Sequence, residues 1–138
     1  MANIQGGYGH GDVFGIPFDF YGGATLVTGS TITMQTNQLV VNPTGTLAAL
    51  TVNLPLNPTD GTCAEITTTQ TLTALTVNAN TGDVIVNGNL TAISTGLTPA
   101  ASTGVGSATA TIKYKYTLNG FQPASGAAVN PRTWIRVQ

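Results

Sequence analysis

The chain has 138 residues, a single Cys and a net charge of −1, and only 7% of its residues are charged, against about 25% in average soluble domains. This length fits one domain with a core of its own. Four basic residues are too few for the patch that nucleic-acid binding needs, and no apolar run reaches the ~20 residues of a membrane-spanning helix. The composition therefore argues against nucleic acid and membrane as partners. So little charge suits a chain that packs against copies of itself or a scaffold.

The first two dozen residues are rich in Gly and aromatic side chains and show no stable alternation. They contain neither the basic nor the apolar region of a secretory signal. We expect an extended arm over residues 1–24, followed by a β-sandwich over residues 25–138. The arm lies either on its own sandwich or on a neighbouring subunit. Its aromatic residues are candidate interface residues: Tyr8, Phe14, Phe18, Phe20 and Tyr21.

From residue 30 onward, β-branched residues alternate with polar ones, and turn motifs rich in Asn, Pro and Gly recur every few positions. The pattern predicts short strands and no helix. The expected strands span residues 30–35, 38–42, 46–54, 62–69, 72–79, 83–86, 90–94, 108–118 and 132–138. About eight strands favour an all-β jelly-roll sandwich.

Two of these strands carry nearly the same phrase, TLAALTVNLP from Thr46 and TLTALTVNAN from Thr71. The shared apolar residues recur with a period of two, which is typical of one buried strand face. Two copies are fewer than the three that a repeat solenoid needs. We therefore interpret the repeat as two equivalent strands of a sandwich, one strand apart.

The strand over residues 108–118 has the clearest alternation. Its apolar face is expected in the core, and its Lys113/Lys115 face in solvent. In the last strand, Trp134 shares a face with Arg132 and Arg136. It forms either a cation–π stack on the sheet surface or an anchor at a subunit interface.

One loop aromatic is a further candidate for an interface. Phe121 lies in the sequence LNGFQPASG and is expected to be exposed. Such a side chain can fill a groove of its own chain or of a neighbour.

The sequence offers little for catalysis. A Cys63–His10 dyad is conceivable, but we interpret Cys63 as a buried thiol, with an intermolecular disulfide as the alternative. Asp60 and Asp83 fall in turns, and Glu65 is expected to pair with a Lys or Arg across its strand. No metal-ligand cluster is recognisable. We expect no enzymatic activity and no cofactor.

The run LTVNLPLNPTDG, followed by ITTTQTLTALTVNANTGDVI and closed by TWIRVQ, resembles β-modules of tailed-bacteriophage structural proteins. These modules occur as capsid decoration (cement) proteins and in head and tail fibres. The resemblance covers about Thr46 to Gln138 and leaves out the N-terminal arm. It rests on the strand–NPxDG–strand phrase, the second LTV strand and the aromatic closing strand.

The resemblance implies a jelly-roll subunit, trimeric with itself, on the exterior of a virion made in the host cytoplasm. Its partner would be the major capsid protein, which it would bind across subunit boundaries to stabilise the shell. The alternative is a trimeric head- or tail-fibre module that binds a host receptor or carbohydrate. That alternative needs an aromatic platform, for which Trp134 and the Tyr114/Tyr116 face are the candidates. A short chain starting at Met1 favours the decoration protein.

Overall fold

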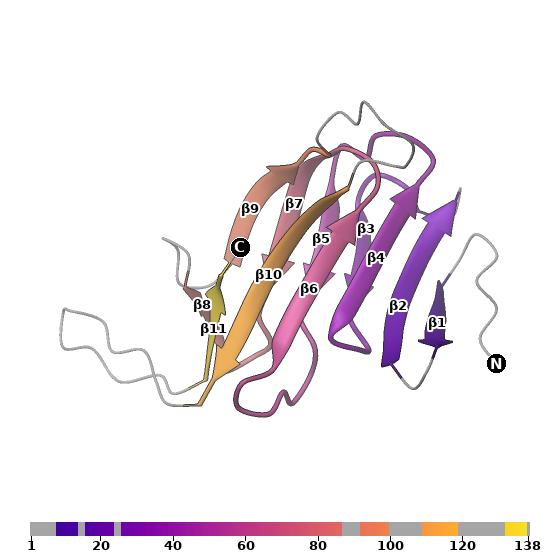
Figure 1. The fold of residues 1–138 in the computed structure, drawn as a ribbon. Helices are drawn as coiled ribbons and strands as arrows, with labels where there is room; N and C mark the ends of the chain where they lie inside the picture. Colours follow the sequence, from indigo (N-terminus) through magenta and orange to yellow (C-terminus); the bar gives the residue numbers. More distant parts are fainter. Residues whose placement is uncertain are drawn as a thin grey trace.

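The computed structural model describes residues 8–13, 16–23, 26–86, 92–99, 109–118 and 132–137. In this part of the chain eleven strands form two facing sheets (Figure 1). The larger sheet has the order β1 (Tyr8–Val13), β2 (Ile16–Gly23), β4 (Gln38–Pro43), β6 (Cys63–Thr68), β10 (Ala110–Thr117), β11 (Thr133–Arg136) and β8 (Val84–Val86). The smaller sheet has the order β3 (Ser30–Thr33), β5 (Leu50–Asn53), β7 (Leu72–Asn78) and β9 (Ala92–Leu97).

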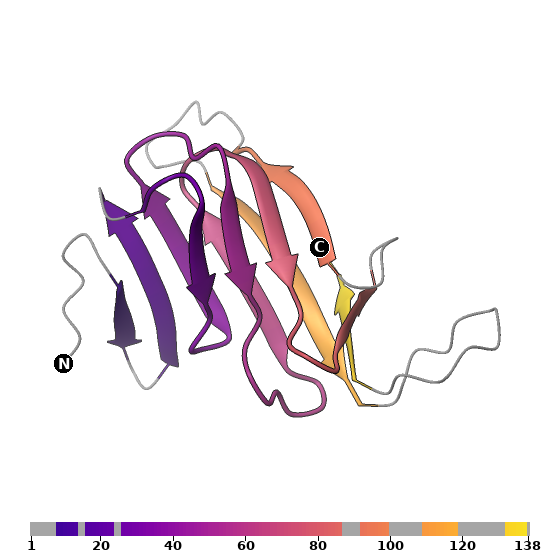
Figure 2. The ribbon, with the colours of Figure 1, turned by 180° about the vertical axis from the view of Figure 1, so that it is seen from behind.

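From β2 to β7 the chain winds back and forth between the two sheets. We call each turn of this winding a coil: one strand of the larger sheet followed by one strand of the smaller sheet, namely β2–β3, β4–β5 and β6–β7. Successive strands alternate between the sheets, and β2, β4 and β6 are paired in parallel, as are β3, β5 and β7. Figure 2 shows the arrows of β3, β5 and β7 running in one direction on the smaller sheet. This gives three stacked coils, the arrangement of β-helical repeat proteins.

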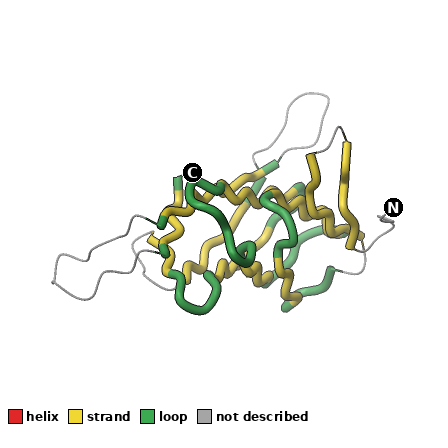
Figure 3. The backbone as a smooth tube through the Cα atoms, turned by 90° about the horizontal axis from the view of Figure 1, so that it is seen from below, coloured by secondary structure: helices red, strands yellow, loops and turns green. Residues whose placement is uncertain are grey.

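Antiparallel strands flank the coils on both sides. β1 pairs antiparallel with β2, β9 with β7, and β10 with β6, while β11 and β8 complete the larger sheet. The view along the strands in Figure 3 shows the two layers and the connections between them.

The all-β prediction is confirmed for the described residues, but the jelly-roll prediction is not. A jelly roll is built from antiparallel Greek keys, whereas the central strands here pair in parallel. From β2 to β7 each strand crosses to the other sheet, and so its neighbour is the strand two places along the chain.

The doubled phrase forms two coils in register. Leu50 pairs with Leu75, Val52 with Val77, and an isolated bridge joins Leu47 to Leu72. The two strands are direct neighbours rather than one strand apart, because β6 lies in the opposite sheet. The remaining coil, formed by β2 and β3, lacks the phrase, and the sequence therefore suggested only two copies.

The core lies between the sheets and is built from the inward residues of both. Val52, Leu54, Ile66 and Val77 are fully buried, as are the inward residues of β10. Each such side chain contributes about 1.5–3 kcal/mol relative to an exposed position. The prediction that the apolar face of β10 lies in the core is confirmed for Ile112, Tyr114 and Tyr116.

The segment expected as an arm contributes to the larger sheet. β2 runs parallel to β4, with Asp19 opposite Leu39 and Tyr21 opposite Val41. Tyr21 packs against the core cluster. The boundary expected at residue 24 therefore does not separate an arm from a body. For the described residues, the segment lies on its own chain.

Candidate interaction surface

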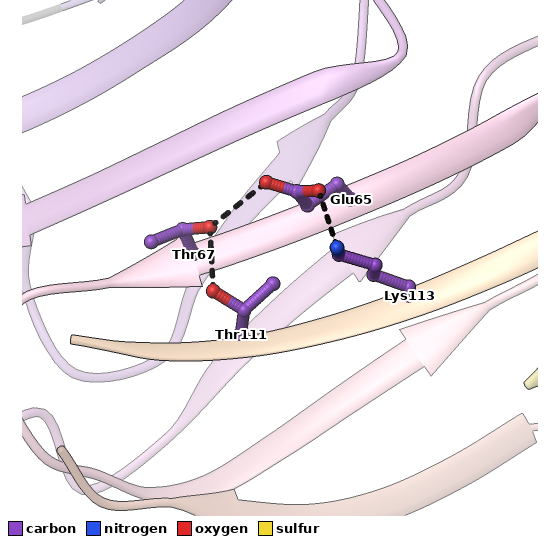
Figure 4. Close-up of polar contacts among 4 residues, drawn as sticks. All are labelled: Glu65, Thr67, Thr111 and Lys113. Atoms are coloured by element: carbon purple, nitrogen blue, oxygen red, sulfur yellow. Dashed lines mark hydrogen bonds and ion pairs between the residues drawn. The ribbon is translucent and has the colours of Figure 1, made fainter. Parts of the chain in front are cut away.

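The outer face of the larger sheet carries polar pairs along the seam between β6 and β10 (Figure 4). Ile66 points into the core, so its neighbours on β6 point outward. Glu65 Oε2 lies 3.4 Å from Nζ of Lys113, and the hydroxyl oxygens of Thr67 and Thr111 lie 3.0 Å apart. The expected cross-strand partner of Glu65 is thereby confirmed.

An aromatic flank lies on one side of this seam. Phe18 and Phe20 alternate with the inward residues of β2 and are half-buried. Phe20 is in register with Val40 of β4, and its ring covers Gly22, where an added Cβ would lie 2.8 Å from Phe20 Cε1. Two of the predicted interface aromatics thus reach this outer face.

An aliphatic flank lies on the other side of the seam, over β11 and β8. Ile135 is 38% exposed and Val137 is 58% exposed. Ile135 is in register with Lys115 on one side and with Val86 on the other. The outer face therefore has a polar centre between an aromatic and an aliphatic flank.

The outer face of the smaller sheet is different, because rows of polar side chains cross it, one of which is hydrogen-bonded from strand to strand. Asn53 Nδ2 donates to Thr33 Oγ1 at 3.1 Å, and Asn78 Nδ2 donates to Asn53 Oδ1 at 3.2 Å. The row beside it consists of threonines: Thr31, Thr51 and Thr76. In the first row the amide side chains hydrogen-bond to their neighbours from coil to coil.

An ion pair between a buried carboxylate and a partly exposed arginine fastens the end of the larger sheet. The Asp83 side chain is fully buried, and its Oδ1 lies 2.7 Å from Nε of Arg132. These residues immediately precede β8 and β11, which pair in parallel, and Val84 N donates to Arg132 O at 3.0 Å. The sequence placed Asp83 in a turn but gave no sign of this partner, since the pairing of β8 with β11 was unknown.

The surroundings of this pair shift the pKa values of both groups. Burial raises the pKa of Asp83, while the Arg132 charge and the nearby indole of Trp134 oppose that rise. The Tyr116 hydroxyl and then the Asp83 charge raise the pKa of Arg132. A carboxylate without solvent access and covered by an arginine is suited to holding two strands together rather than to turnover.

Two other acidic residues accept hydrogen bonds from backbone N–H groups. Asp19 is fully buried, and its Oδ2 accepts from the N–H groups of Gln35 and Thr36 at 2.6 and 3.0 Å. Asp60 Oδ1 accepts from Leu118 N at 2.9 Å. This contact joins the turn of Asp60 to a residue 58 positions along the chain.

Trp134 is neither a surface stack nor an interface anchor. Its side chain is fully buried, and its ring lies 5.0 Å from that of Tyr116, centroid to centroid, at 56°. Both sequence interpretations are therefore wrong for this residue. The two arginines of its face are only partly exposed because they lie at the margin of the inner face.

The remaining aromatic candidates contribute little to the described surface. Tyr21 faces inward and packs on the core; burial, and then the Asp19 charge, raise its pKa. Tyr8 lies in β1, and its side chain is outside the described residues. Phe14 and Phe121 lie outside them altogether.

Cys63 is exposed, which overturns its interpretation as a buried thiol. It is the first residue of β6, and the phase of that strand directs Ala64 and Ile66 inward instead. The side chain of His10 is outside the described residues, so the conceivable dyad has no described geometry. Within the described ranges no three His, Cys, Asp or Glu residues cluster as metal ligands.

In the same ranges, no helix is long and apolar enough to cross a membrane. Comparison of the chain with protein-family models, with curated proteins and with solved structures finds no match.

Proposed function

We propose that the protein is a virion structural subunit that decorates a capsid and stabilises it by binding across major capsid protein subunits. One observation supports a binding role above all. Every acidic side chain among the described ones serves a contact within the fold: Asp19, Asp60, Glu65 and Asp83. The surface available to other molecules consists of the two outer sheet faces, which carry few charges.

The mechanism is binding without chemistry. A subunit that spans a boundary between shell proteins adds buried area that must be lost before the shell opens. Many copies on one shell turn modest contacts into high avidity.

The parallel coils also favour one alternative, a module of a head or tail fibre, since stacked coils extend readily along one axis. A receptor or carbohydrate site on such a module would need an exposed aromatic platform. The aromatics suggested for that platform, Trp134, Tyr114 and Tyr116, are buried. The decoration role is therefore the better supported of the two.

The direct test mixes the purified protein with capsids that lack it and measures binding and heat resistance. We expect saturable binding and a higher temperature of shell rupture. Two variants identify the docking face: Ile135→Lys on the larger sheet, and Thr73→Lys, which places the same charge at an exposed position of the smaller sheet. Binding without any gain in heat resistance, or no binding, contradicts the proposal.

A further inference from the structure

Acidic and basic residues are separated along this chain. All five Asp and Glu residues lie at or before residue 83, and all four Lys and Arg residues lie at or after residue 113. On the outer face of the larger sheet, this separation falls at the β6–β10 seam. Glu65 lies on its β6 side, and Lys113 and Lys115 lie on its β10 side.

Such a face is complementary to itself under a two-fold rotation. When two copies pack face to face, the axis lies in the plane between them. An axis along the seam places β6 of one copy over β10 of the other. Glu65 then meets the second copy's Lys113, and Thr67 meets the second copy's Thr111, with each contact made twice.

The rotation also brings the flanks of the two copies together, because β4 of the second copy lies over β11 and β2 lies over β8. Gln38 of the second copy then lies over Val137, since both are level with Glu65, and the aromatic residues Phe18 and Phe20 lie beside the aliphatic flank rather than directly over it. Ile135 and Val137, two of the exposed large hydrophobic residues of the described chain, would be covered. We infer that the outer face of the larger sheet is a two-fold interface between two copies of this chain.

The size of the face indicates to which class of interface the contact belongs. Six strands from β2 to β8, about 4.8 Å apart, and about 20 Å of strand length give roughly 500 Å² per copy. Stable interfaces bury about 800 Å² per partner, so this one belongs at the weak and reversible end. We expect a dimer that dissociates on dilution, in place of the trimer that the phage resemblance implies.

This inference goes beyond the proposed function and does not depend on it. The dimer is measured on the purified protein alone, whereas shell binding requires capsids. A failure of one therefore leaves the other standing.

The test uses charge reversal at the seam. Glu65→Lys leaves only basic groups at positions 65 and 113, and Lys113→Glu leaves only acidic ones. Each variant alone should dissociate at least about tenfold more readily than the wild type in analytical ultracentrifugation, because like charges then face each other twice. An equimolar mixture of the two variants should regain the dimer, because the basic face of one then meets the acidic face of the other.

Two controls separate this interface from any other. Both variants lose the same exposed ion pair within the chain, so their monomer stabilities, followed by urea unfolding, should stay close to wild type. Thr73→Lys adds a charge to the other sheet and should leave dimerisation unchanged. A monomer at every concentration overturns the inference, as does an oligomer that ignores both reversals or a mixture that associates no better than its components.

Discussion

The stacked coils from β2 to β7 and the closing strands β8 to β11 are stabilised in different ways. In the coils, similar side chains stack in register from one strand to the next, as Val52 does on Val77 and Asn53 on Asn78. In the described closing strands, the contacts occur once: they are made by one Trp, by two Tyr residues and by the ion pair of the buried Asp83 carboxylate.

The difference concerns how stability is distributed. In-register ladders spread it over many small, similar contacts, each made between neighbouring coils. The closing strands concentrate it in a few large side chains, whose loss leaves cavities or unpaired groups. We therefore expect substitutions in the coils to have graded effects and substitutions in the closing strands to have large ones.

The largest expected effect comes from Trp134→Ala, which removes a fully buried indole. We expect a loss of about 3–5 kcal/mol in the free energy of unfolding, measured by urea denaturation. Hydrogen exchange should show protection lost in β11 and β8 before it is lost in β5 and β7. Equal loss of protection in both regions would mean that the two regions unfold as one unit.

A coil substitution, Val77→Ala, should cost less, about 2 kcal/mol. The double variant with Val52→Ala sharpens the comparison, because the two residues are in register. If ladders share packing, the double variant should lose less than the sum of the single losses. Strict additivity would show that the strands pack independently of each other.

The polar ladder should be weaker still. Asn53→Ala removes one donor and one acceptor from the row that joins Thr33 to Asn78. We expect a cost of about 1 kcal/mol, since the row is only half-buried and water can replace the lost bonds. Thr73→Ala, on the same face, provides the control and should change the unfolding free energy by less.

The smallest effect is a change with pH at Asp83, where the sign is the informative quantity. Burial raises the pKa of Asp83 in the folded chain, so the folded chain binds this proton more tightly than the unfolded chain does. The resulting stabilisation is present in acid and is lost as the pH rises through the folded-state pKa.

The matched comparison is with Asp83→Asn, which cannot titrate. The unfolding free energy of the wild type minus that of the variant should fall as the pH rises from below the ordinary Asp pKa through the raised pKa of Asp83. Other carboxyl groups cancel in this difference. A rise over the same range would mean that the Arg132 charge outweighs the burial of the carboxyl group.

The sequence predicted where strands form better than how they pair. Each segment predicted from residue 30 onward overlaps a strand, because alternation of apolar residues is a local property. Parallel pairing was missed because it depends on which sheet receives the next strand. The alternation of residues 62–69 predicts a strand, but it does not indicate that this strand, β6, lies in the opposite sheet from β5.

The candidate surface was predicted only in part. The partner of Glu65 follows from residue type and strand phase. Phe18 and Phe20 were predicted as interface residues of an arm, and nothing in that segment showed the strand phase that directs them outward. Trp134 was misplaced because its neighbours on that face, Arg132 and Arg136, suggested a surface position. In the structure they lie at the margin of the inner face, and Trp134 lies inside it.

The in-register stacking of the doubled phrase has a consequence for how such a chain can change length. Asn78 bonds to Asn53, which precedes it by 25 residues, and the residues between them complete one circuit of both sheets. Duplicating the gene segment for those residues would insert one strand into each sheet. The inserted strands would carry the same side chains as the strands beside which they pack. A longer body would arise from a single duplication, with the outermost strands at either side unaltered.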